Sequence, residues 1–238
     1  MAISVNTVYR TVLLIINKEQ RGYLTPDEFN KTAAQVQLEI FNEYFEDLNQ
    51  QVRVQDNDTE YSNRIKNLQE KIAIFQTEGT CPPVAGGFNI PPVLDFYKLG
   101  TVIYNDDKEV QYVQPNEILE LNLSPITKPS KYWPVYTYKN LIIKVYPAPS
   151  SADTISCTYL RKPSNPIWNF TSTPPNYQYV YSPPTSITNP SVDFELHPIE
   201  QTNLITRILL YSGIVINDPQ IVQVAAQQIQ AETINSKS

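Results

Sequence analysis

The residues that could carry catalysis in this chain are few and far apart. Its only histidine, His197, precedes Pro198 at the entrance of an expected helix. Histidine titrates near neutral pH and is a common general base, so a Ser-His-Asp or Cys-His arrangement would have to use it. The G-x-S-x-G pattern of a nucleophile elbow does not occur in the sequence. The sequence therefore favours a structural or surface role for His197 over nucleophilic hydrolysis.

Carboxylates at alternate positions suggest a calcium-binding loop near residue 56, but the pattern is incomplete. Asp56, Asp58 and Glu60 follow the alternation of such a loop. The sixth position, where glycine is needed, is Tyr61, and the twelfth, where glutamate is needed, is Asn67. A solvated turn and helix cap is the favoured interpretation, and we expect no metal site.

A second pair of carboxylates, Glu117 and Glu120, has the residue types that glycoside hydrolysis requires. Such pairs are common on short helices, so we expect surface charges. Gly86 and Gly87 lack both the strand-loop-helix context and the following Lys-Ser or Lys-Thr of a phosphate-binding loop. We therefore expect neither catalytic residues nor a cofactor.

Three alternating tyrosines form the clearest candidate binding surface. Tyr177, Tyr179 and Tyr181 would place three rings on one face of a strand. Rings in such a row can stack on sugars or bases, but aromatic ladders more often pack in a core or against another subunit. We favour the subunit interface, and a glycan-binding module remains the alternative function.

The composition excludes several classes of function. The formal net charge is −6 and no long basic run is present, which argues against a protein that wraps nucleic acid phosphates. Cys81 and Cys157 are too few and too far apart in the sequence for a disulfide framework or a zinc site, so two free thiols in a reduced cytosolic setting are expected. The apolar run at 11–16 is too short for a membrane span and lacks a cleavage site, so we expect a soluble protein.

Helical periodicity dominates the first third of the chain. Apolar residues at spacings of three and four predict helices over 4–20 and, after a capping box at Thr25 and Glu28, from Pro26 to about Leu48. A third helix is expected from about residue 59 to Phe75. The Gly and Pro residues that follow between 79 and 87 break the helical pattern and predict a linker.

Alternating apolar residues predict strands in the middle of the chain. The expected strands lie at 93–99, 101–104 and 109–113, with a turn at 105–108 and a short helix over 116–122. The clearest run predicts a three-stranded antiparallel meander of 135–138, 141–146 and 154–160.

The last third contains an irregular segment and then helices. Residues 168–190 are rich in Pro, Tyr and Ser, and a hairpin of 177–181 with 192–196 is possible there. A helix is expected over 199–216, and a Gln-rich helix follows after a cap at 217–219. Polar contacts with a partner are expected from the last helix at Gln227, Gln228 and Gln230.

Together these elements predict an α+β protein with four parts. Residues 1–80 would form an N-terminal three-helix bundle and 81–167 a central antiparallel β meander or sandwich. Residues 168–197 would form an extended Pro/Tyr-rich arm. Residues 198–238 would form C-terminal helices that pack back on the bundle.

The order of these segments resembles that of a known group of viral proteins. Three segments carry this resemblance: an N-terminal segment VNTVYRTVLLIINKEQRGYLTPDEFN, a middle segment PVYTYKNLIIKVYPAPSSADTISCTYLRKPSNPIW and a C-terminal segment ELHPIEQTNLITRILLYSGIVINDPQIVQVAAQQIQAE. The chain resembles the head-to-tail connector proteins (adaptor, ring or neck proteins) of tailed bacteriophages, most closely those of short-tailed crAss-like phages. The phrase IKVYPAPSSADTISCTYLRKP is the most specific part, and the 168–190 segment is not covered.

The resemblance implies a structural virion protein, assembled in the cytoplasm of a bacterial host. It implies a ring of twelve copies that joins the portal to the next tail or ring protein around a channel through which genomic DNA passes. No catalytic residues are carried over. Sequence-specific DNA binding and membrane contact are not expected, and an acidic chain can line such a channel because it repels phosphates.

Overall fold

The computed structural model describes residues 2–18, 23–53, 59–90, 95–150, 153–172, 179–215, 223–224 and 226–231. The chain is a mixed α+β protein and divides into two compact units. Unit 1 combines Met1–Ile74 with Pro163–Ser238, and unit 2 is Phe75–Lys162. The named helices and strands of unit 1 come from both ends of the chain, and unit 2 is a continuous stretch.

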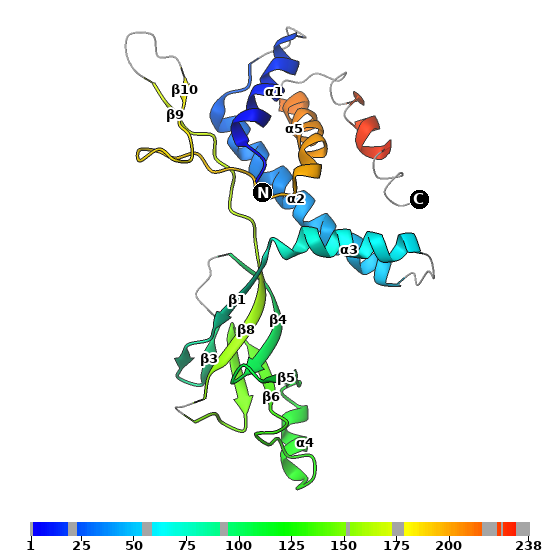
Figure 1. Ribbon diagram of the computed structural model, residues 1–238, viewed down its shortest axis with the longest axis vertical. Helices are drawn as coiled ribbons and strands as arrows, with labels where there is room; N and C mark the ends of the chain where they lie inside the picture. The colour runs from blue at the N-terminus through cyan, green and yellow to red at the C-terminus, as the bar shows by residue number, and fades with distance from the viewer. Residues whose placement is uncertain are drawn as a thin grey trace. The chain divides into compact units, whose positions relative to one another are not determined.

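Unit 1 is mainly helical. Its helices are α1 (Val5–Lys18), α2 (Pro26–Arg53), α3 (Thr59–Ala73), the 3-10 helix η1 (Pro198–Glu200) and α5 (Gln201–Val215). In Figure 1, α1 and α2 in blue lie beside α5 in orange, and α5 contacts both of them. α3 contacts α2. The predicted N-terminal three-helix bundle is not confirmed; α5, from the other end of the chain, packs against α1 and α2, as expected of the C-terminal helices.

The start of α2 is fixed by the predicted capping box. The backbone N–H and the Oγ1 hydroxyl of Thr25 donate to Glu28 Oε2 at 2.9 and 2.7 Å, and the Glu28 N–H donates back to Thr25 Oγ1 at 3.3 Å. These bonds satisfy backbone donors that the helix itself leaves free. The hydrogen bonds from Thr25 also hold the pKa of the Glu28 carboxyl below its usual value. This part of the sequence prediction is confirmed.

The segment after unit 2 returns to the core of unit 1. Strand β9 (Phe170–Thr171) pairs with β10 (Val180–Tyr181), while Ile167 pairs with Val192 and Ile3 with Phe194 through isolated bridges. The predicted hairpin of 177–181 with 192–196 is therefore wrong. Phe194 and Leu196 are fully buried in unit 1. Removing these apolar side chains from water favours this position over pairing with β10.

The predicted arm at 168–197 is consequently anchored at both ends. Trp168 is buried at one end and Leu196 at the other. Between them, Ser191 is also buried, and its backbone neighbour Pro190 accepts a hydrogen bond from the Asn169 side chain at 2.7 Å. The two ends of this segment thus pack in unit 1, whereas residues 183–190 between them are mostly exposed.

Unit 2 is built on one curled sheet. Its strands are β1 (Gln76–Thr80), β2 (Pro83–Val84), β3 (Gly87–Asn89), β4 (Phe96–Tyr104), β5 (Lys108–Tyr112), β6 (Val135–Lys139), β7 (Ile142–Tyr146) and β8 (Ile155–Arg161). Over the described part of unit 2 these eight strands follow the order β1-β8-β4-β5-β6-β7-β3-β2. Neighbours are antiparallel except β5 and β6, which are parallel. The inner face holds a core that includes Val102, Val110, Tyr136, Ile143, Val145, Ile155 and Cys157.

Both predicted turns of this sheet occur, but the one between β6 and β7 lies one residue later than the gap at 139–140 between the predicted strands. β6 and β7 pair from Val135 opposite Tyr146 to Lys139 opposite Ile142, and the two linking residues, Asn140 and Leu141, have φ of 52° and 64°. Positive φ at both positions gives a tight hairpin whose twist matches the strands. The predicted turn between β4 and β5 also occurs.

Two other expectations about the sheet are wrong. The third strand of the predicted meander, β8, pairs with β1 and β4 and not with β7. The predicted linker over 79–87 instead contains strand residues of β1, β2 and β3. Gly87 shows why glycine is needed there: a Cβ at this position would lie 2.4 Å from the carbonyl oxygen of Ile143 on the paired strand β7.

The β4–β5 turn and the loop before β8 are held together by Asp153. Its carboxylate accepts hydrogen bonds from the Ser150 N–H and hydroxyl, both at 2.7 Å, and from the Asn105 amide at 3.2 Å. Hydrogen bonds from Tyr104 first, and then from Ser150 and Asn105, hold the pKa of Asp153 well below its usual range. The ionised form is therefore the one that the folded protein prefers.

This arrangement predicts a pH dependence of the stability of unit 2. A depressed carboxyl pKa adds stability above the unfolded-state value of about 4, and this stability is lost as the pH falls from there toward the folded pKa. Amide hydrogen exchange in β8, corrected for intrinsic rates, should therefore show weaker protection at pH 3 than at pH 6. The drop should be smaller in Asp153→Asn. An equal drop in Asp153→Asn and in the exposed control Asp107→Asn would contradict this role.

Candidate functional site

The connection between β5 and β6 carries helix α4 (Glu117–Leu123) and a loop over 124–134. Because β5 and β6 are parallel, the chain must cross over between them, and this connection makes that crossover. Ile118 on α4 is buried against Val113 and Val135, with Leu121 packed beside them. Figure 1 shows α4 next to the β5 and β6 end of the sheet. One face of α4 is thus fixed on the sheet.

The other residues of this crossover expose large apolar side chains. Ile126 is 95% exposed and Trp133 is 81% exposed. If a whole aromatic ring covers about 200 Å², three exposed rings here (Tyr112, Tyr132 and Trp133) present roughly 400 Å² to solvent. Monomeric proteins rarely expose much more than this in one patch. We call this surface the tip; its exposed apolar residues are Tyr112, Leu119, Leu123, Ile126, Tyr132 and Trp133.

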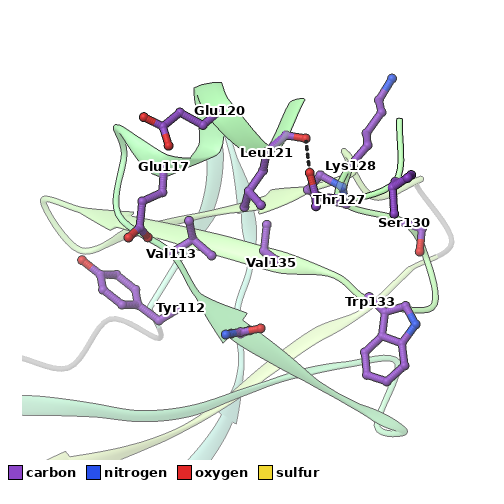
Figure 2. Close-up of a pocket in the computed structure, with 13 residues that line it drawn as sticks. Tyr112, Val113, Glu117, Glu120, Leu121, Thr127, Lys128, Ser130, Trp133 and Val135 are labelled. Atoms are coloured by element: carbon purple, nitrogen blue, oxygen red, sulfur yellow. Dashed lines mark hydrogen bonds between the residues drawn. The ribbon is translucent and has the colours of Figure 1, made fainter. Parts of the chain in front are cut away.

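A pocket of about 630 Å³ lies within the tip. Figure 2 shows Glu117 and Glu120 projecting from α4 on one side of it, and Lys128 and Trp133 from the loop on the other. Apolar side chains of Val113, Leu121 and Val135 line the pocket between these two sides. The pocket therefore combines an apolar floor with charged and aromatic walls.

Hydrogen bonds within the loop hold this shape. The backbones of Ser130 and Trp133 exchange two hydrogen bonds, of 3.3 and 3.1 Å, and the Lys128 N–H donates to the Ser124 carbonyl at 3.1 Å. The Thr127 hydroxyl donates to the Leu121 carbonyl at 3.4 Å, which Figure 2 draws as a dashed line. These bonds fix the direction in which Trp133 leaves the backbone.

Two lysines near the pocket, Lys131 and Lys108, interact with other residues of the protein. Lys131 pairs with Asp153 at 3.6 Å, and Lys108 lies 4.9 Å from the centre of the Tyr132 ring. By contrast, Glu120 and Lys128 form no ion pair with any residue that the structure describes, although both line the pocket. Charges with no internal partner are available to an external one.

The two glutamates do not have the arrangement of a glycosidase pair. In that chemistry the carboxylates flank the scissile bond from opposite sides. Glu117 and Glu120 instead leave the same short helix on the same side of the pocket. The Glu117 carboxylate also accepts a hydrogen bond from the Gln114 N–H at 3.2 Å and so helps to fix the start of α4.

The predicted tyrosine surface is packed within unit 1. Tyr177 lies outside the described residues. The Tyr181 ring stacks on Trp168 with centroids 5.9 Å apart, and the Tyr179 ring meets Phe170 edge-on at 4.5 Å. Rings engaged in this way present less free face to a sugar. Tyr179 remains 45% exposed, so one side of it can still contact another molecule.

The other predicted residues with a described position belong to unit 1. Gln227, Gln228 and Gln230 are exposed on a helical stretch over 226–231 in unit 1. Nδ1 of His197 accepts a hydrogen bond from the Ile199 N–H at 3.3 Å and caps η1, which is a structural role. The Asp56 and Asp58 pattern lies outside the described residues.

The two cysteines, though distant in sequence, are neighbours in unit 2. Cys81 and Cys157 are buried free thiols whose sulfur atoms lie 3.1 Å apart. No cluster of metal-ligating side chains occurs in the described ranges, and no described helix has the length and apolar character needed to cross a bilayer.

The tip was not singled out from the sequence. Its signal was the apolar residues Leu119 and Leu123 on α4, which lie outside the face that the sheet buries, together with Ile126 in the loop that follows. The Tyr132-Trp133 pair in a Pro, Ser and Lys loop is a second signal, since loops rarely carry two adjacent large rings.

No protein family model matches the chain, and no curated protein matches it significantly in sequence.

Proposed function

We propose that this protein is a structural virion protein that forms a ring in the head-to-tail connector of a tailed bacteriophage. In this role it joins the portal to the next tail or ring protein, with about twelve copies surrounding a channel for the genomic DNA. The proposal combines the resemblance in segment order with the surface of unit 2. It assigns the protein a task of assembly, without a substrate.

The observation that carries the proposal is the exposed tip. Large exposed apolar patches on folded proteins mark contact surfaces, because leaving them in water costs free energy and promotes aggregation. Ile126 and Trp133 are held outward by a hydrogen-bonded loop on a rigid sheet, so the exposure is built into the fold. A subunit that must meet neighbours needs such a preformed surface.

The acidic character of the chain agrees with a DNA channel. The formal net charge is −6, and phosphates passing a surface of like charge are not held by it. The glycan-binding alternative receives less support, since the rings of Tyr179 and Tyr181 pack on Phe170 and Trp168.

The test is assembly with the portal protein of the phage from which the chain comes. Mass photometry and negative-stain electron microscopy of the mixture should show rings bound to the portal. The double variant Ile126→Ser/Trp133→Ser should lose this association while keeping its circular dichroism spectrum. Ile187→Ser, which removes an equally exposed isoleucine in unit 1, is the matched control and should assemble normally.

Two results would overturn the proposal. One is a protein that stays monomeric with and without the portal at concentrations well above those of virion assembly. The other is that the tip variant and the Ile187→Ser control assemble equally well, which would separate assembly from the tip.

A further inference from the structure

From the pocket at the tip we infer a binding site for a polypeptide segment of a partner protein, one that carries a Lys or Arg beside a large apolar residue. The inference deepens the proposed function, because it names the chemistry by which the tip recognises its neighbour. It rests on the shape, charge and exposure of the pocket.

The apolar part of the pocket suits an apolar side chain of the bound segment. Val113, Leu121 and Val135 line its floor, and Trp133 stands at its rim. A volume of about 630 Å³ is large enough for one or two side chains with their backbone, and small ligand sites fall in the same range. A Leu, Phe or Met side chain placed there would bury apolar surface against these residues.

The charged part calls for a cation next to that apolar group. Glu117 and Glu120 lie one turn apart on α4 and face the same side of the pocket, with the Tyr112 ring below them in Figure 2. No residue in the described ranges forms an ion pair with either carboxylate. Carboxylates beside an aromatic face suit a guanidinium or ammonium group, which gains both charge pairing and a cation–π contact.

Lys128 on the opposite wall of the pocket would fix the orientation in which a charged segment binds. It would attract an acidic side chain or a chain terminus at the other end of the bound segment and repel a second cation there. The complement is therefore a short segment with a basic residue at one end and an apolar residue at the centre. A sugar offers no such charge, so two carboxylates without an ion-pair partner among the described residues favour a polypeptide.

The chain contains its own reporter for this site. It has two tryptophans, and Trp168 is 4% exposed while Trp133, at the rim of the pocket, is 81% exposed. Filling the pocket should shift the Trp133 emission to shorter wavelength and protect it from acrylamide. The buried Trp168 contributes a constant background.

The experiment uses the full chain and a positional-scanning library of nine-residue peptides with blocked ends. Peptides with Arg or Lys next to Leu, Phe or Met should be enriched, and the best of them should protect Trp133 from quenching. Glu117→Gln/Glu120→Gln should weaken its binding at least tenfold. The control Glu78→Gln/Glu109→Gln removes two exposed charges of unit 2 that do not line the pocket and should bind normally.

A charge reversal makes the test decisive. In Glu117→Lys/Glu120→Lys the preference should change from basic to acidic peptides. The inference is overturned if the wild-type chain selects no basic peptides, if both double glutamine variants bind alike, or if a glycan panel and not the peptides protects Trp133. Rings that form on the portal without any basic-peptide preference would refute this inference alone, and peptide binding without rings would refute the connector function alone.

Discussion

Replacing Trp168 with alanine is expected to destabilise unit 1 by about 3–5 kcal/mol, the usual cost of removing a buried tryptophan side chain. Its ring lies 4.3 Å from that of Tyr9 on α1 and also contacts Phe170 and Tyr181. Its backbone N–H donates to the Asn30 side chain on α2 at 2.7 Å, and its indole N–H donates to Asn6 at 3.2 Å. One residue thus fastens the returning chain to two helices.

The measurement is amide hydrogen exchange in α1 and α2, read peptide by peptide because the chain has two units. Protection of these helices should fall in Trp168→Ala and stay unchanged in Trp133→Ala, since Trp133 is 81% exposed. The two substitutions remove the same side chain from opposite environments. Similar small effects of both would mean that the aromatic cluster around Trp168 does not hold unit 1 together.

The aromatic cluster around Trp168 also explains where the rings of the alternating tyrosines Tyr179 and Tyr181 pack. The sequence showed three rings on one strand face but not what that face would meet. In the structure, Trp168 and Phe170 meet Tyr181 and Tyr179 across the β9–β10 pair. An alternating pattern specifies a common face, whereas the partner of that face depends on residues elsewhere in the chain.

Local signals in the sequence predicted local structure well. The capping box at Thr25 and Glu28 is formed by residues three apart, and the turn at Asn140 needs only two residues with positive φ. Each of these features is determined within a few residues, so a pattern in the sequence is sufficient to find it.

Pairing between distant strands could not be predicted in this way. β8 follows β7 in sequence and has the same alternation, yet it pairs with β1 and β4, which precede it by more than fifty residues. Any two amphipathic strands can pair in principle, and the choice depends on how all of them share one core. The short β1, β2 and β3 were missed because Gly and Pro in them break every periodic pattern.

The tip illustrates a different limit. The sequence gives the apolar residues of α4, but exposure is a property of the whole fold. Ile118 and Leu119 are adjacent and similar in chemistry, yet Ile118 is buried on the sheet and Leu119 is 68% exposed. Which of them faces water depends on the parallel pairing of β5 with β6, and a local pattern cannot supply that pairing.

Removing the carboxylate of Glu200 is expected to destabilise unit 1 by about 3 kcal/mol, near the lower end of what breaking a buried ion pair costs. Glu200, in η1, is buried and accepts a hydrogen bond from Lys71 of α3 at 2.5 Å and from Asn203 at 3.2 Å. The Lys71 ammonium also lies 5.3 Å from the centre of the Tyr44 ring on α2. This cluster joins three helical elements from the two ends of the chain.

The expected loss of stability arises from the Lys71 ammonium, which Glu200→Ala leaves without its ion-pair partner. Lys71 would remain partly buried without its counter-charge, and this desolvated cation is the main cost. In Lys71→Met/Glu200→Ala neither charge remains, so much of the lost stability should return. A double-mutant cycle by urea denaturation should therefore give strong coupling between the two sites.

The exposed pair of Lys31 and Asp27 provides the control for this prediction. Its atoms lie 2.7 Å apart, but both side chains are about three-quarters exposed, so Lys31→Met should change stability far less than Glu200→Ala does. If Glu200→Ala costs no more than Lys31→Met, the Lys71–Glu200 pair does not fasten α3 to η1. If the double variant is no more stable than Glu200→Ala, the cost arises from lost packing and not from an uncompensated charge.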